Sequence, residues 1–234
     1  MNHFSIRDCL FVFALTALTA LTALTGCDDH HQRATQSMGK RTLGLVVQKR
    51  PGAGIVQALT RLGYFQYASP AHVAALKREV AAAYHQGHVL TTVEDERTGA
   101  PYCFRRYNCD AEDLFEVGGL VDKLQEIKPT FDKMGVPLVW ADDYFAEDGS
   151  QHTIVLNGKP YTAFRGAPET PDAWGQATRN FVAMLNDQLA RHHSLERVYP
   201  MLGGNEGYIV FLTTPLYQFI NANFDAHDGP RMPD

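Results

Sequence analysis

The chain has 234 residues, of which 45% are hydrophobic and 20% are charged, so neither a disordered chain nor a fibrous repeat fits the composition. Its 21 lysine and arginine residues and 26 aspartate and glutamate residues give a formal net charge of −5. Nucleic acids and anionic lipid surfaces both bind clustered basic charge. The charge balance therefore argues against nucleic acid or anionic lipid as the main partner.

The N-terminal segment is the most informative part of the sequence. Residues 9–25 carry no charge and contain four copies of Ala-Leu-Thr. This run is short for a bilayer-spanning helix, which needs about 20 apolar residues, and slightly long for the apolar region of a signal peptide. It ends in Leu24, Thr25, Gly26 and Cys27. This ending resembles the lipobox of bacterial lipoprotein precursors.

The resemblance implies that residues 1–26 are a signal peptide and that Cys27 receives a diacylglyceryl group on its sulfur. The new amino terminus would carry a further acyl chain such as palmitate. Two or three acyl chains hold a protein stably on a membrane, whereas one chain does so only marginally. An uncleaved membrane anchor, or an ordinary signal peptide with Cys27 incidental, stays open as an alternative.

The residues after Cys27 indicate a tether on the outer side of the membrane. Asp28 and Asp29 resemble the signal that keeps some lipoproteins at the inner membrane, so the inner membrane is favoured over the outer, on the periplasmic side. Residues 27–42 are otherwise polar and predict a tether. Two adjacent histidines, His30 and His31, could contribute to a metal site, but a solvated tether explains them better. Residues 43–234 are then expected to form one globular domain.

Three pairs of hydroxyl residue and proline predict helix starts, because the hydroxyl caps an amide and proline gives up an amide that the helix cannot use. They lie at Ser69, Thr170 and Thr214. The first helix is expected to run to about residue 85 and to end at Gly87. The second is expected over 171–192, with an apolar stripe of Trp174, Ala177, Phe181, Leu185 and Leu189. Another helix is expected over 120–134.

Strand signals lie between these helices. Residues 153–156 and 161–164 flank Asn157-Gly158, the strongest short signal for a hairpin. Apolar runs at 136–140 and 208–213 predict two more strands, the second covered on both faces. Residues 198–199 are expected to pair with it as another hairpin. The order of elements predicts a single α+β domain with a mainly antiparallel sheet.

Cys103 and Cys109 are the two cysteines that remain if residue 9 is removed and Cys27 is acylated. An even pair outside the cytoplasm is a candidate disulfide. The bridge requires a turn at residues 105–108, yet residues 102–107 could equally form a straight strand. The compartment favours the bridge, and geometry leaves both forms open.

Acidic clusters are the main candidates for function, because the sequence contains no nucleophile elbow, zinc-helix motif or phosphate-binding loop. One cluster consists of Glu94, Asp95 and Glu96, and another of Asp142, Asp143, Glu147 and Asp148. A third contains Asp110, Glu112, Asp113, Phe115 and Glu116. A solvated face explains most such clusters. The third combines acids with an aromatic residue and a glycine pair, which is typical of a surface that docks a basic protein.

Two hypotheses follow. The first is an envelope lipoprotein that binds a protein with a basic surface through the cluster at residues 110–116. Its plan of anchor, tether and one acidic domain resembles immunity lipoproteins that neutralise toxins delivered between bacteria. The second is an envelope hydrolase that uses one carboxylate from each of two clusters. The missing motifs favour binding over catalysis, and the sequence predicts no cofactor and no metal site.

Overall fold

The computed structural model describes residues 52–88, 102–202, 207–224 and 229–233. All of these residues belong to one compact unit, residues 47–234. These residues form an α+β domain with helices and two three-stranded antiparallel sheets. The predicted fold class is therefore confirmed.

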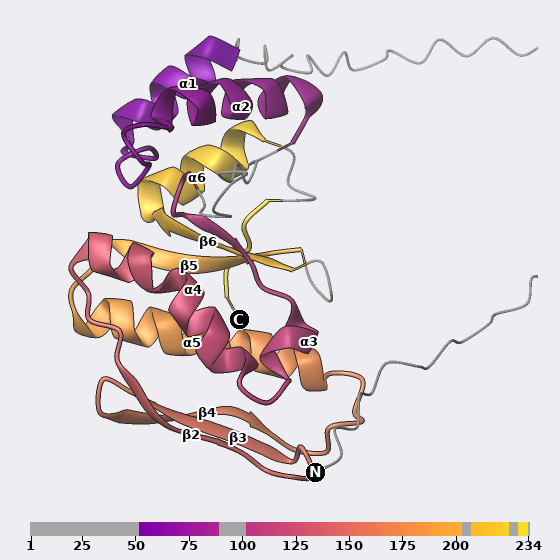
Figure 1. Cartoon of the computed structure of the whole chain (residues 1–234). Helices are drawn as coiled ribbons and strands as arrows, with labels where there is room; N and C mark the ends of the chain where they lie inside the picture. Colours follow the sequence, from indigo (N-terminus) through magenta and orange to yellow (C-terminus); the bar gives the residue numbers. More distant parts are fainter. Residues whose placement is uncertain (1–51, 89–101, 203–206, 225–228, 234) are drawn as a thin grey trace, which may run out of the picture. The chain divides into compact units, whose positions relative to one another are not determined.

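Helices α1 (Gly52–Arg61) and α2 (Val73–Gln86) pack against each other (Figure 1). The start predicted for α2 is wrong by three residues, because the residue at the cap position is His72 rather than Ser69. The amides of His72 and Val73 both donate to the Ser69 carbonyl at 2.9 Å, so residues 70–72 form a turn before the helix begins. The predicted end is confirmed, because Gly87 caps the helix in the left-handed conformation with a φ of 89°.

The first sheet has the strand order β1 (Arg106–Asn108), β6 (Tyr208–Thr213), β5 (Glu196–Met201), and all pairs are antiparallel. Side chains of β6 alternate between two buried clusters. Val210 and Leu212 pack with α1, α2 and α6 (Thr214–Asn223), whereas Ile209 and Phe211 face the opposite cluster. The prediction of a central strand covered on both faces is confirmed, as is its pairing with residues 198–199.

The outer edge of β5 is closed by side-chain and backbone hydrogen bonds rather than by another strand. The Asn186 amide group accepts from the Val198 amide at 2.8 Å and donates to the Val198 carbonyl at 2.9 Å. Further along, the Arg231 amide donates to the Pro200 carbonyl at 2.9 Å. Proline has no amide to donate, so this edge offers few free groups to another chain.

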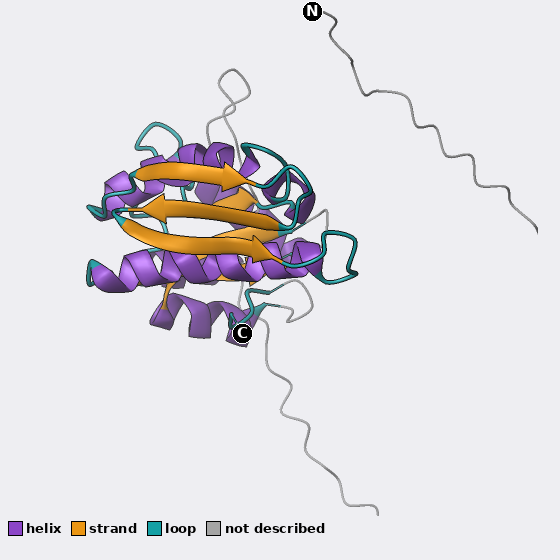
Figure 2. Ribbon diagram, turned by 90° about the horizontal axis from the view of Figure 1, so that it is seen from below, coloured by secondary structure: helices purple, strands orange, loops and turns teal. Residues whose placement is uncertain are grey.

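The second sheet consists of β2 (Trp140–Phe145), β3 (Gln151–Leu156) and β4 (Lys159–Arg165). Figure 2 shows it from its outer side, where no helix lies in front of it. The hairpin between β3 and β4 is confirmed, with φ of 47° at Asn157 and 76° at Gly158. The strand predicted at 136–140 is wrong, because β2 begins at Trp140. Val136 and Leu138 are buried in irregular chain before it.

Helices α4 (Gly119–Met134) and α5 (Ala173–Arg191) contribute to a buried cluster that reaches both sheets (Figure 1). The prediction of α4 is confirmed to within one residue, with Pro129 inside the helix. In α5 the stripe from Ala177 to Leu189 is buried, as predicted. Trp174 is an exception, because its side chain is 40% exposed. No helix in the described ranges is long and apolar enough to cross a bilayer.

The structure corrects the expected disulfide, because Cys103 and Cys109 are both buried free thiols. Cys103 packs in the cluster of α1, α2 and α6, whereas Cys109 packs in the cluster of α4 and α5. Between them, Phe104 has a φ of 51° and Arg106–Asn108 form β1. The two side chains therefore pack in different buried clusters on opposite faces of the first sheet, and they form no bridge.

Thiol labelling tests this arrangement. Burial raises the pKa of the Cys109 thiol to about 12, and the thiolate is the reactive form. We expect Cys103 and Cys109 to resist alkylation in the folded chain and to react fully after denaturation without reductant, as read by peptide mass spectrometry. A Cys103→Ala/Cys109→Ala chain gives the background. Labelling that requires a reductant would contradict the structure.

Candidate functional site

The predicted acidic cluster lies at the junction of α3 (Ala111–Leu114) and α4. The Asp110 carboxylate caps α3 by accepting a hydrogen bond from the Glu112 amide at 2.8 Å. A Cβ atom at Gly119 would lie 1.7 Å from the Asp113 carbonyl oxygen. Only glycine permits this approach, so Gly119 forms a tight backbone junction between α3 and α4.

Beside this junction, acidic side chains line a hollow with a volume of about 310 Å³. Its charged lining residues are Asp113, Glu116, Asp122, Lys123 and Glu126. We call this surface the acidic hollow. Only Asp113 and Glu116 belong to the cluster predicted at residues 110–116. The helical period of α4 puts Asp122 and Glu126 on one face, and that shared face was the signal available in the sequence.

Lys123 is the single cation that lines the acidic hollow, and it already forms an ion pair. Lys123 is 8% exposed, and its ammonium group donates to the Glu126 carboxylate one turn further along α4. Asp113, Glu116 and Asp122 are exposed. Four carboxylates and one ammonium leave the hollow with a formal charge of −3. This arrangement attracts a cationic group from solution.

The remaining predicted residues do not line the hollow. Phe115 is half-buried, and its ring packs edge-on against Phe164 at 4.6 Å and Phe145 at 6.2 Å between centroids. It holds α3 against the second sheet rather than offering an aromatic contact to a partner. Val117, which is 81% exposed, is the apolar side chain presented next to Glu116.

The cluster at residues 142–148 serves local structure. The Asp143 carboxylate lies 2.7 Å from Nε2 of His152, which is buried. The Asp148 carboxylate accepts from the Ser150 amide at 3.0 Å, and hydrogen bonds from Ser150 lower its pKa. Asp142 has a φ of 51° at an irregularity in β2. The cluster at residues 94–96 lies outside the described residues.

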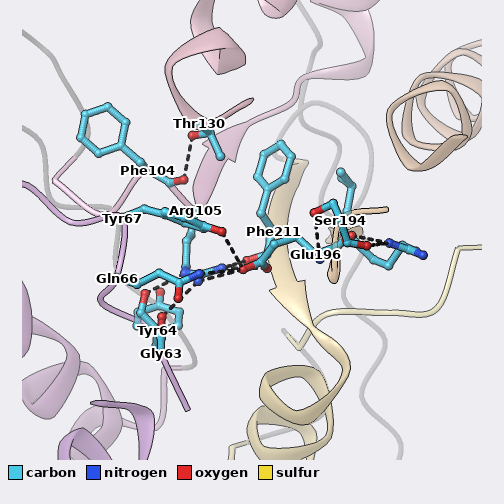
Figure 3. A network of polar contacts seen from close by, with 12 residues as sticks. Gly63, Tyr64, Gln66, Tyr67, Phe104, Arg105, Thr130, Ser194, Glu196 and Phe211 are labelled. Carbon is cyan, nitrogen blue, oxygen red and sulfur yellow. Dashed lines mark hydrogen bonds and ion pairs between the residues drawn. The ribbon is translucent and has the colours of Figure 1, made fainter. Parts of the chain in front are cut away.

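Figure 3 shows a buried polar network that no sequence pattern predicted. Arg105 in the chain before β1 is fully buried, and its guanidinium group forms an ion pair with Glu196 of β5 at 2.9 Å. Tyr67 and Gln66 each donate to the same carboxylate at 3.2 Å. Burial and the Glu196 charge raise the pKa of Tyr67 to about 12. The residues that pair are 91 positions apart, so no local pattern indicated them.

Glu196 is the one buried carboxylate in the described part of the chain. A catalytic carboxylate requires access to substrate and a proton to exchange. Arg105, Tyr67 and Gln66 occupy the oxygens of Glu196, so the network is a structural link between the first sheet and the segment after α1.

A cavity with a volume of about 600 Å³, which is in the range of small-molecule sites, lies elsewhere in the domain. It lies between the start of α5, the ends of β5 and β6, and residues 231–233. Trp174 and Tyr208 give it aromatic walls. Asp172 and Arg179 add charge, but they form an ion pair with each other, which lowers the pKa of Asp172. Arg231 also lines the cavity, which therefore combines apolar contact with charged groups.

Comparison of the chain with protein-family models, with curated proteins and with solved structures finds no match. Among the described residues, no group of three or more histidine, cysteine, aspartate or glutamate side chains is placed to hold a metal ion.

Proposed function

We propose that this protein is a lipid-anchored envelope lipoprotein whose domain binds a partner protein with a basic surface at the acidic hollow. The observation that supports this proposal is the convergence of Asp113, Glu116 and Asp122 as exposed carboxylates around one concavity. The neighbouring Lys123 does not neutralise these carboxylates, because its ammonium group forms an ion pair with Glu126. A lysine or arginine side chain from a partner matches both the charge and the size of the hollow.

Binding fits this geometry better than the alternative of a carboxylate hydrolase. A hydrolase raises the pKa of one acid by burying it in a cleft. In both described acidic clusters the carboxylates are exposed or half-buried, and those at Asp110, Asp143 and Asp148 hold nearby backbone or side-chain groups. The hydrolase stays a prediction, because neither described cluster contains the buried carboxylate that such an enzyme requires.

The partner to test first is a toxin. The plan of anchor, tether and acidic domain resembles immunity lipoproteins, which neutralise toxins delivered between bacteria. In this proposal the acyl chains on Cys27 keep the domain at the membrane surface where such a toxin acts, and the acidic hollow captures it. Mass spectrometry of the native N-terminal peptide tests the anchor. Acyl chains on Cys27 support it, and an unmodified thiol rejects it.

Neutralising the hollow tests the binding surface. We expect Asp113→Asn/Glu116→Gln/Asp122→Asn to weaken the complex with a captured partner about tenfold or more and to flatten its salt dependence. Glu126 is retained because its loss would leave the Lys123 ammonium buried without a partner. Binding is measured by surface plasmon resonance at several salt concentrations.

A matched variant controls for net charge. Glu79, Glu147 and Glu169 are exposed and lie outside the hollow. Changing these three to glutamine removes the same number of negative charges. We expect this variant to bind as tightly as the parent chain. Equal weakening by both variants would reject the acidic hollow as the binding surface.

A further inference from the structure

Charged residues are distributed unevenly along the chain. Between residues 30 and 78 there are eight lysine and arginine residues and no aspartate or glutamate. Residues 79–234 contain 12 basic and 23 acidic residues. With Arg7, Asp8, Asp28 and Asp29 included, residues 1–78 carry a formal charge of +6 and residues 79–234 a formal charge of −11. The net charge of −5 is the sum of these two values and does not describe either part.

In the folded domain, the basic part contributes a groove between α1 and α2 with a volume of about 540 Å³. Its floor includes Ala53, Val56 and Ala81, and its charged residues are Arg61, Lys77 and Arg78. We call this surface the basic groove. Both arginines are exposed, and Lys77 lies over the Phe65 ring at 5.2 Å.

We propose that the basic groove docks on an anionic phospholipid surface. An apolar strip bordered by lysine and arginine is the composition of protein surfaces that lie in the interface of a membrane, where the cations meet lipid phosphates and the apolar side chains meet the upper acyl chains. Among the described residues 52–88, the single acidic residue is Glu79, which does not line the groove. Charge complementarity therefore selects an anionic occupant.

The position of α1 in the chain supports the same occupant. Helix α1 is the first described helix after the proposed tether, residues 27–42, and is therefore the helix closest in sequence to the proposed anchor at Cys27. The residues between Cys27 and α1 contain five cations against two carboxylates, Asp28 and Asp29; the cations are Arg33, Lys40, Arg41, Lys49 and Arg50. Juxtamembrane clusters of this size are attracted to anionic lipid at a distance of about one Debye length.

The opposite charge of the acidic hollow gives the docking an orientation. Helices α1 and α2 pack on one face of the first sheet, and α4 packs on the other (Figure 1). An anionic membrane attracts the basic groove and repels the acidic hollow, so docking would leave the hollow open to a partner. This orientation rests on two parts of the proposed function, which are the anchor at Cys27 and partner binding at the acidic hollow.

A fluorescent probe at the groove tests the docking. The full chain with Gln57→Cys carries a bimane label at the groove, and it is reconstituted in phosphatidylcholine vesicles with brominated acyl chains, with or without phosphatidylglycerol. Cys103 and Cys109 are buried, and the labelled parent chain gives the background. We expect quenching in the anionic vesicles, much weaker quenching in the neutral ones, and loss of the difference at high salt.

Two charge-reversal variants decide the outcome. Because each cation near an anionic surface is worth about fivefold in binding, Arg61→Glu/Arg78→Glu should lower the ratio of docked to undocked groove at least about 30-fold. Arg165→Glu/Arg191→Glu makes the same change in net charge at exposed sites outside the groove and should leave quenching intact.

Three results would overturn the proposal. The first is equal quenching of the label in neutral and anionic vesicles. The second is an equal loss of quenching in the two charge-reversal variants. The third is no quenching in either kind of vesicle. If neither lipid quenches the probe, an acidic protein segment is the remaining ligand that matches the charge of the basic groove. Sedimentation with neutral vesicles reports the anchor separately. A chain that leaves neutral vesicles but is quenched in anionic ones rejects the anchor and retains the groove.

Discussion

Replacing Arg105 by methionine should lower the free energy of unfolding by about 3–5 kcal/mol, because the change leaves the Glu196 carboxylate buried without its cation. The guanidinium group uses its donors fully. Besides Glu196, it donates to the carbonyl oxygens of Tyr64 at 2.7 Å, Phe211 at 2.7 Å and Gly63 at 3.1 Å. The variant removes all of these contacts at once. Urea unfolding followed by circular dichroism measures the loss.

Two further variants compare the buried ion pair with an exposed one and separate its contribution from that of the carbonyl contacts. Lys128 forms an exposed ion pair with Asp132, and such pairs contribute about 0–1 kcal/mol, so Lys128→Met should change stability little. Adding Glu196→Leu to Arg105→Met removes the stranded carboxylate and should restore part of the loss. A double variant no more stable than Arg105→Met would show that the carbonyl contacts, rather than the ion pair, supply the stability.

Gly119→Ala should lower the free energy of unfolding by about 3 kcal/mol through steric overlap at the junction of α3 and α4. The new Cβ atom would lie 1.7 Å from the Asp113 carbonyl oxygen, and the obstacle is backbone rather than the end of a flexible side chain. The helices must separate to relieve the contact. Because Asp113 lines the acidic hollow, the folded variant should also bind the proposed partner less tightly than the parent chain.

Gly135→Ala is the matched control in the same helix. Gly135 caps α4 with a φ of 69°, and an added Cβ atom would meet nothing within 4 Å. Only the backbone preference is lost, which costs about 1–2 kcal/mol. Partner binding should be unchanged, since Gly135 does not line the hollow. Equal losses of stability in the two variants would contradict the close backbone approach at Gly119.

Local signals in the sequence predicted those elements that depend on a few adjacent residues. The Asn157-Gly158 turn requires positive φ at two successive positions, and few residue pairs other than this one accept it. The left-handed cap at Gly87 has the same origin. The start of α2 was misplaced because a hydroxyl residue before proline also begins a turn, and at Ser69 the backbone carbonyl accepts the hydrogen bonds instead.

The periodic pattern of α5 predicted its buried face but not the exposure of Trp174. A 3.6-residue period identifies side chains that share a stripe, yet it does not show where the neighbouring elements stop covering that stripe. In the structure Trp174 lies in the first turn of α5 and borders the cavity of about 600 Å³. The apolar run at 136–140 failed as a strand for a related reason, since burial of Val136 and Leu138 needs no regular hydrogen bonding.

The sequence by itself determined the α+β class, the hairpin of the second sheet, the central strand β6 and helix α4, because turn chemistry, caps and periodicity act within a few residues. Only the tertiary structure decided which distant groups meet. It brings Asp122 and Glu126 beside Asp113 and Glu116, pairs Arg105 with Glu196, and separates Cys103 from Cys109 by a sheet. Such contacts depend on how whole elements pack, and packing is set by the sum of many weak interactions rather than by any short motif.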